Sequence, residues 1–330
     1  MNKYILLLAL GLLAGSQCFA ETPENSIYVE LVDQGVPLSS GDRAKLPVFL
    51  MVDGLDQAGQ QKVLDELIAK TKDGPTLKQL LDNKAAAPFI RISTAIPNSD
   101  SHQIDLYFIA YGSLQTVANG NFWKARIGQQ DKDGKGAKLD FLEDKDLTQR
   151  GLTALNKPNI KERWAHAKDV DLLSTVLVRG TAHTIETIGD ESVVVAILLD
   201  PKFQDDKAFP NEWRKITFNK AGAKNIGPPN PYDGLGAYAK VTKLANPAGA
   251  LFVEYHIIYN EPQEWFKGTG VLDTRLLEMI RNDVKRFRND LKTAPAGVQA
   301  GAAAPAGGQG QQPAGPQAAA PAPAGSASKK

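Results

Sequence analysis

Short segments with the features of β-strands follow one another from residue 88 to residue 260, with few helical segments between them. Residues 89–96 and 103–111 alternate apolar and polar side chains with the period of two that is typical of a strand, and residues 97–102 favour a turn. Further strand-like segments lie at 171–179, 181–188, 192–199, 213–219, 237–244 and 250–259. Strands that alternate with helices indicate a parallel sheet, and that alternation is missing here. The sequence therefore predicts an α+β fold: mainly an antiparallel sheet or sandwich, with helices near both ends of the folded region.

Two of the predicted strands are expected in the core, and a further hairpin is predicted elsewhere. The segment from Ser192 to Leu199 is apolar almost throughout, which predicts a central strand buried on both faces. Residues 46–52 predict a shorter buried strand. Residues 121–142 predict a hairpin with a charged tip. We find no internal repeat.

Apolar residues spaced three and four apart predict the helices. One begins after Asp56 and extends to about residue 68, and Thr76 can cap a shorter second helix. Residues 274–291 predict an amphipathic helix that packs on the sheet. A helix lying on a membrane surface is the alternative, but acidic residues among the basic ones on its polar side disfavour it.

The first 20 residues have the organisation of a secretory signal peptide. Lys3 precedes an apolar run of about nine residues, too short for a bilayer that needs roughly 20 helical residues. Cleavage is predicted between Ala20 and Glu21. A lipid on Cys18 is an alternative, but Gln17 stands where lipidation sites have a small residue. We therefore expect an exported protein, periplasmic or extracellular, with no transmembrane segment after signal removal.

The last part of the chain has a different composition. Residues 294–330 are rich in Ala, Pro, Gly and Gln and contain no aromatic residue and no carboxylate. Such a segment cannot bury enough apolar surface to offset its ordering entropy, so we expect a disordered tail. The exported globular domain then spans residues 21–293. A small 21–87 subregion followed by an 88–293 sheet is the alternative division.

Composition excludes several classes of function. Cys18 is the only cysteine, so the cleaved chain has none and cannot use thiol chemistry or zinc–thiolate sites. The chain has 38 basic and 37 acidic residues, and removal of Lys3 with the signal leaves 37 of each. Nucleic-acid binders usually carry a basic excess, so no nucleic-acid partner is expected.

No metal or other cofactor is expected either. Residues 131–136 resemble the start of a calcium loop, but Lys135 and Leu142 stand where oxygen ligands are required. A carboxylate cluster that includes Asp200 and Asp206 follows the predicted central strand, and nearby lysines make simple solvation the better interpretation. The short sequence motifs of serine hydrolases and zinc proteases are absent.

The candidate catalytic residues are His183, Glu254 and His256, which lie in predicted strands. Glu254 and His256 are two residues apart and therefore share one face of a strand. A carboxylate beside an imidazole can orient it and raise its basicity. The structural alternative is the polar outer face of an antiparallel sheet.

The candidate binding residues are Tyr232, Pro229 and Asn230, in a predicted proline-rich loop over residues 224–236. Long irregular connections in compact domains are often functional, and Tyr232 could present a rigid aromatic contact.

Our leading interpretation is an exported, soluble, non-catalytic binding or envelope-associated protein, whose partner is an unidentified protein or cell-envelope ligand. The alternative is a secreted hydrolase that uses the His/Glu site.

Overall fold

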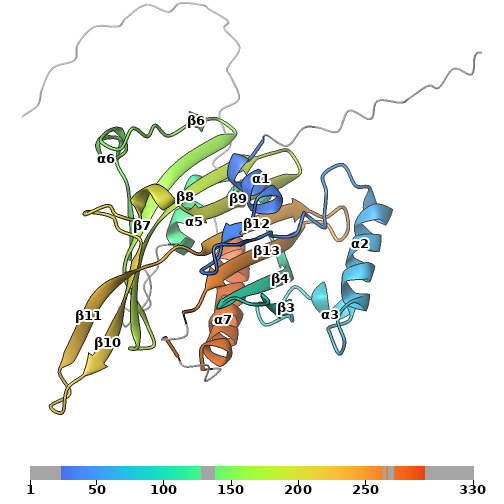
Figure 1. Ribbon diagram of the computed structural model, residues 1–330. Coiled ribbons are helices and arrows are strands. Elements are labelled where there is room, and N and C mark those ends of the chain that lie inside the picture. Colours follow the sequence, from blue (N-terminus) through green and yellow to red (C-terminus); the bar gives the residue numbers. More distant parts are fainter. Residues whose placement is uncertain (1–23, 128–137, 263–264, 267–270, 294–330) are drawn as a thin grey trace, which may run out of the picture. The chain divides into compact units, whose positions relative to one another are not determined.

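The computed structural model describes residues 24–127, 138–262, 265–266 and 271–293 (Figure 1). The expectations for the signal peptide, for the calcium-like loop at 131–136 and for the tail at 294–330 fall outside these residues. Chain contacts group residues 1–296 into one compact unit and residues 297–330 into another, and all described helices and strands belong to the first.

One antiparallel sheet of eleven strands dominates the fold (Figure 1). Its main path runs β11-β10-β8-β9-β12-β13-β4-β3, and β7 pairs with β8, β5 and β6. The strands are β3 Ile90–Ala95, β4 Ser101–Tyr111, β5 Lys138–Phe141, β6 Asn156–Lys157, β7 Ile160–Leu172, β8 Val176–Ile188, β9 Ser192–Leu199, β10 Glu212–Phe218, β11 Lys224–Pro231, β12 Leu235–Lys243 and β13 Ala250–Asn260. A separate two-stranded sheet joins β1 Val36–Pro37 to β2 Arg43–Ala44. The predicted α+β class with a mainly antiparallel sheet is confirmed, with one large sheet in place of a sandwich.

Short helices precede and interrupt the sheet, and a long one follows it. The helices are α1 Ser26–Asp33, α2 Gln57–Ala69, α3 Leu77–Leu80, α4 Leu114–Val117, α5 Gly120–Ile127, α6 Asp144–Thr148, the 3-10 turn η1 Pro201–Phe203 and α7 Val271–Thr293. Asp56 caps α2 and Thr76 caps α3 through a capping box, as the sequence predicts. Among the described residues, no helix is both long and apolar enough to cross a membrane.

Helix α7 packs on one face of the sheet, as predicted. Val284, Phe287 and Leu291 join a core cluster with residues of β4, β9, β12 and β13. The basic residue Arg288 of this helix is buried, and its guanidinium donates hydrogen bonds to the carbonyls of Ile109 and Pro88. Burial lowers the pKa of Arg288 to about 10.

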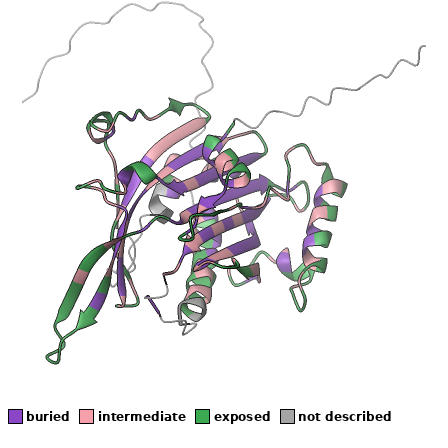
Figure 2. Cartoon of the chain, in the orientation of Figure 1, coloured by how far each residue is buried: buried purple, intermediate pink, exposed green. Residues whose placement is uncertain are grey.

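The N-terminal segments cover the opposite face. Helix α1 and the residues after it contribute Ile27, Leu31 and Leu46 to a second cluster, and α2 and α3 cover a third. Strand β9 lies between β8 and β12 and is buried on both faces, which confirms the prediction for Ser192–Leu199 (Figure 2).

Several predicted elements are wrong. Residues 46–52 form no strand: they cross the sheet as an irregular segment, whose polar backbone groups bond to side chains of the sheet instead of to a neighbouring strand. The hairpin over 121–142 is wrong because its first half is helix α5, where Phe122 and Trp123 pack on Phe287.

Three further differences concern strand β7, the turn after it and the predicted loop at 224–236. The charged residues of β7 obscure its period of two, so the sequence predicts no strand from 160 to 170. The turn between β7 and β8 lies at 173–175, where Leu173 and Ser174 adopt positive φ without the glycine or asparagine that usually signals it. The loop predicted at 224–236 is mostly strand β11, which pairs with β10.

Candidate binding site on the sheet face beneath α7

Strand register places a set of side chains in rows on the face that carries α7. One row runs across four strands through Glu186, Val195, Ala239 and Tyr255. The next row includes Thr184 (β8), Ile197 (β9), Ala237 (β12) and Ile257 (β13). Residues directly opposite on neighbouring strands point to the same side of a sheet. These rows therefore share the face on which α7 packs.

Three apolar side chains in these rows are only partly buried, although their strands are central. They are Ile197, Tyr255 and Ile257. The opposite-facing neighbours Tyr238, His256 and Ile258 are almost inaccessible to solvent. Helix α7 thus covers this face incompletely, and an accessible apolar floor remains in the middle of the sheet.

A buried carboxylate stands at one end of this floor. Glu186 is 1% exposed, and its carboxylate lies 3.5 Å from the Arg163 guanidinium and 3.9 Å from Lys161 Nζ. Lys161 Nζ donates to the carbonyl of Ala118, at the end of α4. Glu186 Oε1 accepts no hydrogen bond within the part of the chain that the structure describes. Burial raises the pKa of the Glu186 carboxyl, and Lys161 and Arg163 oppose this.

A hollow lies beside β7, next to Arg163. This hollow of about 350 Å³ is lined by Arg163 and Glu162 of β7 together with residues of β5, α6 and the segment before β6. Arg163 therefore contacts both Glu186 and this hollow. The other polar group on the floor is the Tyr255 hydroxyl, whose pKa is raised to about 12 by burial and by the charge of Asp283 on α7.

Glu254 and His256 lie on the opposite face, beneath residues 46–53, which we call the strap. The Glu254 carboxylate accepts hydrogen bonds from the N–H groups of Leu50 at 2.8 Å and Met51 at 3.0 Å. Burial raises the pKa of Glu254, and these two bonds are the largest opposing effect. Both Glu254 and His256 are 0% exposed, so neither can reach a substrate in solution.

The side chains around Glu254 complete the attachment of the strap. Lys240 Nζ donates to the Met51 carbonyl and pairs with Asp53, both at 2.8 Å. The Tyr238 hydroxyl donates to the Pro47 carbonyl at 2.7 Å. His256 Nδ1 contacts Asp105 Oδ1 at 2.7 Å. This cluster holds the chain across the sheet.

The fold does not place His183 near the other two candidate catalytic residues, Glu254 and His256. It lies on β8, separated from β13 by β9 and β12. Its ring stacks on Trp164 with centroids 4.2 Å apart, and its Nε2 lies 2.6 Å from Glu162 Oε1. The three residues therefore have separate partners and form no common site.

The three candidate binding residues differ in how far they are exposed and do not form one surface. Tyr232 is buried, stacks on Trp265, and donates from its hydroxyl to the Asn260 carbonyl at 3.3 Å. Pro229 is exposed and Asn230 is partly buried, both in β11. Tyr232 thus anchors the base of β11 and presents no surface contact.

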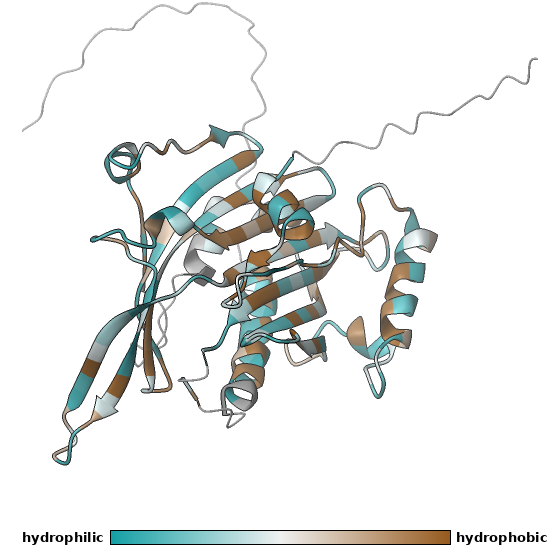
Figure 3. Cartoon of the chain, in the orientation of Figure 1, coloured by the Kyte–Doolittle hydropathy of each residue, from teal (hydrophilic) through white to brown (hydrophobic). Residues whose placement is uncertain are grey.

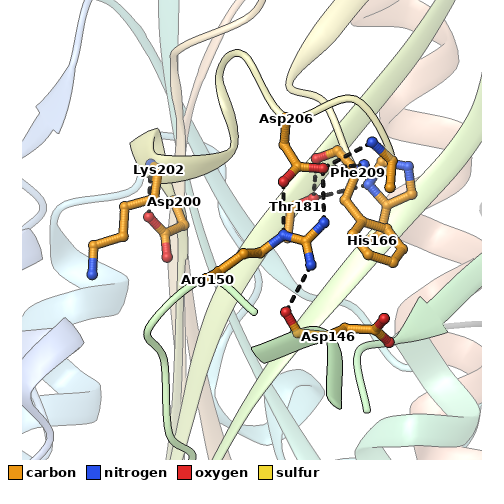
Figure 4. A network of polar contacts seen from close by, with 9 residues as sticks. Asp146, Arg150, His166, Thr181, Asp200, Lys202, Asp206 and Phe209 are labelled. Atoms are coloured by element: carbon orange, nitrogen blue, oxygen red, sulfur yellow. Dashed lines mark hydrogen bonds and ion pairs between the residues drawn. The ribbon is translucent and has the colours of Figure 1, made fainter. Parts of the chain in front are cut away.

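Asp200 and Asp206, two of the carboxylates after β9, bond to other parts of the chain, and Figure 4 shows Asp206 beside Arg150. Asp206 forms a two-point pair with Arg150, at 2.7 and 3.0 Å, and Asp200 accepts from the Trp164 ring N–H at 2.8 Å. Hydrogen bonds from Arg150 lower the pKa of Asp206 to about 2. No group of three or more potential metal ligands occurs among the described residues.

Sequence reasoning missed Glu186 as a site residue. The available signal is weak: a single Glu between apolar and Thr residues, on the side of β8 that alternation turns inward. Its neighbours Lys161 and Arg163 belong to the strand that the sequence did not predict.

No family model matches the chain, and no curated protein is significantly similar to it. Among solved structures, the lipid transfer and protein localization domain of human StarD13 is 10% identical, with a TM-score of 0.36, covering 72% of this chain and 98% of its own. A STAR-related lipid transfer protein from Xanthomonas axonopodis is 8% identical, with a TM-score of 0.35, covering 60% of this chain and 93% of its own. Scores this low do not establish a shared fold.

Proposed function

We propose that the folded part of this chain is a non-catalytic binding protein for an amphipathic small molecule, held on the sheet face beneath α7. The observation that carries this proposal is the accessible apolar floor of Ile197, Tyr255 and Ile257 beside the buried Glu186. Binding sites for small molecules are mostly apolar, with a few polar groups that fix orientation.

The floor and its polar end define the chemistry of the ligand. Its apolar body covers Ile197 and Ile257, where burial contributes roughly 25 cal/mol per Å² of apolar surface. Its polar end carries a hydrogen-bonding group, such as a hydroxyl, and meets the partly exposed side chains of Arg163 and Lys161. Glu186 is only 1% exposed, so it acts by pairing with these two cations and not by bonding the ligand itself.

Catalysis is not part of the proposal. The hydrolase alternative requires His183, Glu254 and His256 to converge on an accessible pocket. Two of them are inaccessible under the strap, and the third lies three strands away with its own partner.

We also propose that the protein acts after export, in the periplasm or outside the cell. This rests on the signal-like sequence of residues 1–20. Intact-mass measurement of exported protein tests it, with a mature chain beginning at Glu21 as the expected result. A lipid on Cys18 would contradict the soluble form.

The binding proposal is tested with a long-chain alcohol that carries a nitrobenzoxadiazole fluorophore. The chain from Glu21 should bind this probe, and Ile197→Trp should weaken binding at least tenfold, because the larger ring fills the floor. Val48→Trp is the matched control, since Val48 is 67% exposed on the strap. No binding by the unchanged protein, or equal binding by a folded Ile197→Trp variant, would contradict the proposal.

A further inference from the structure

Strands β10 and β11 form a two-stranded arm that projects beyond the rest of the sheet (Figure 1). Strand β10 pairs with β8 only from Glu212 to Lys215. Beyond Lys215 the arm continues as a ribbon, with one further bond from the Ile216 N–H to the Thr175 carbonyl. We call residues 215–226 the tip of the arm.

The tip has a defined turn. The Asn219 side chain accepts hydrogen bonds from the N–H groups of Ala221 and Ala223, and Gly222 adopts a φ of +77° that favours glycine. Register places Ile216 opposite Ile226, and Phe218 two residues further along the same side. Phe218 and Ile226 therefore point to one face of the ribbon.

Large apolar side chains are exposed on this tip. Phe218 is 55% exposed and Ile226 is 46% exposed, and Leu173 in the adjoining β7–β8 turn is 40% exposed. Figure 3 shows apolar bands on an arm that is otherwise polar, and Figure 2 shows that most of the arm is exposed. Phe218 and Ile226 are therefore exposed, whereas Ile216 on the same face, nearer the sheet, is buried.

Beyond Glu212, at the base of β10, the charges on the arm are all positive. From Trp213 to Tyr232 the sequence has four basic residues and no carboxylate, although the whole chain is almost neutral, and Arg214 among them pairs with Glu212. Lys224 pairs with Asp171 of β7, and Lys215 and Lys220 are exposed on the tip. Basic residues beside exposed aromatic and aliphatic side chains are the composition of segments that bind anionic lipid surfaces.

A protein partner that adds a strand fits this arm poorly. Strand β11 is the edge of the sheet and contains Pro228, Pro229 and Pro231, which lack the N–H groups that an added strand would need. A lipid surface needs no such backbone pairing.

We propose that the tip of the β10–β11 arm docks end-on on an anionic lipid bilayer, with Phe218 and Ile226 at the headgroup boundary and Lys220, in the turn, facing the lipid charges. Lys215 lies on the other face of the ribbon from Phe218 and adds positive charge from that side. This surface is separate from the proposed ligand site, so each proposal can fail without the other.

Co-sedimentation with vesicles tests the proposal, using the chain from Glu21. Vesicles of phosphatidylcholine alone are compared with vesicles that contain phosphatidylglycerol. We expect binding to the anionic vesicles and a decrease with added salt. Phe218→Ser/Ile226→Ser should reduce binding at least tenfold. Lys215→Gln/Lys220→Gln should reduce it by more than tenfold, because each lysine near an anionic surface contributes about fivefold.

Matched controls separate the arm from general effects. Met279→Ser replaces an apolar residue of α7 with the same 55% exposure, and Lys62→Gln/Lys84→Gln removes two exposed lysines elsewhere. These variants should bind like the unchanged protein. The proposal is overturned if the unchanged protein does not bind anionic vesicles, if the arm variants bind equally well, or if the controls lose binding to the same extent. Capture of an acidic protein by the arm without vesicle binding would also overturn it.

Discussion

Three of the buried charged side chains bond to backbone groups. Glu254 accepts from two N–H groups, Arg288 donates to carbonyls, and Lys240 donates to Met51. Such bonds offset the cost of removing a charge from water. In a sequence, the same residue types suggest catalysis. Glu186 differs because it pairs with the side chains of Lys161 and Arg163, and one of its oxygens accepts no bond among the described residues.

The Arg150–Asp206 pair makes stability depend on pH. Because the folded-state pKa of Asp206 is lowered from 3.8 to about 2, the pair stabilises the fold above pH 4 and loses this contribution as the pH falls towards 2. Asp206→Asn should therefore cost about 2 kcal/mol in the free energy of unfolding at pH 7. The difference from the unchanged protein should shrink below pH 4, as measured by urea unfolding.

Asp205→Asn is the matched control, since the neighbouring Asp205 is exposed. It should have little effect at any pH. An Asp206→Asn penalty that stays constant from pH 7 to pH 3 would show that the pair does not titrate as described.

Among the elements, the strap shows most clearly where a sequence pattern is insufficient. Its apolar residues 46–52 favour a buried strand, and the segment is indeed pressed on the sheet, with Met51 fully buried. A strand also needs a neighbouring strand for its hydrogen bonds. Here the side chains of Glu254, Lys240 and Tyr238 supply those bonds from the sheet below, and no local pattern can indicate such distant partners.

Glu254→Gln tests the attachment of the strap. The amide NH₂ group of Gln would point at one of the two backbone N–H donors, so that hydrogen bond is lost. The other N–H would then donate to a neutral amide oxygen in place of a charged carboxylate, which weakens that bond. We expect a loss of about 2–4 kcal/mol in the free energy of unfolding. Hydrogen exchange of the Leu50 and Met51 amides should increase more than exchange in β9.

Glu278→Gln, on an exposed part of α7, is the control and should leave both quantities nearly unchanged. If the Leu50 and Met51 amides kept their protection in a folded Glu254→Gln variant, the carboxylate would not be what holds the strap.

At the scale of the whole molecule, the sequence is sufficient for the fold class and insufficient for the site. Alternation and apolar runs identify most strands, because each strand's pattern is local. The site depends on which strands are neighbours. Glu186 and Tyr255 lie in the same row of side chains only because β9 and β12 pair between their strands in the observed register. His183 and His256 illustrate the converse, because both lie in strands, yet two strands separate them.

The location of a bound ligand is the most direct test of the proposed function. Protein with isotopically labelled isoleucine methyl groups is titrated with the nitrobenzoxadiazole-labelled alcohol and followed by NMR. The methyl resonances of Ile197 and Ile257 should shift in a saturable manner. Ile258, buried on the opposite face of β13, should change little. Saturable shifts confined to Ile258 and its neighbours, or no shift at Ile197 and Ile257 when the probe is bound, would contradict a binding site beneath α7.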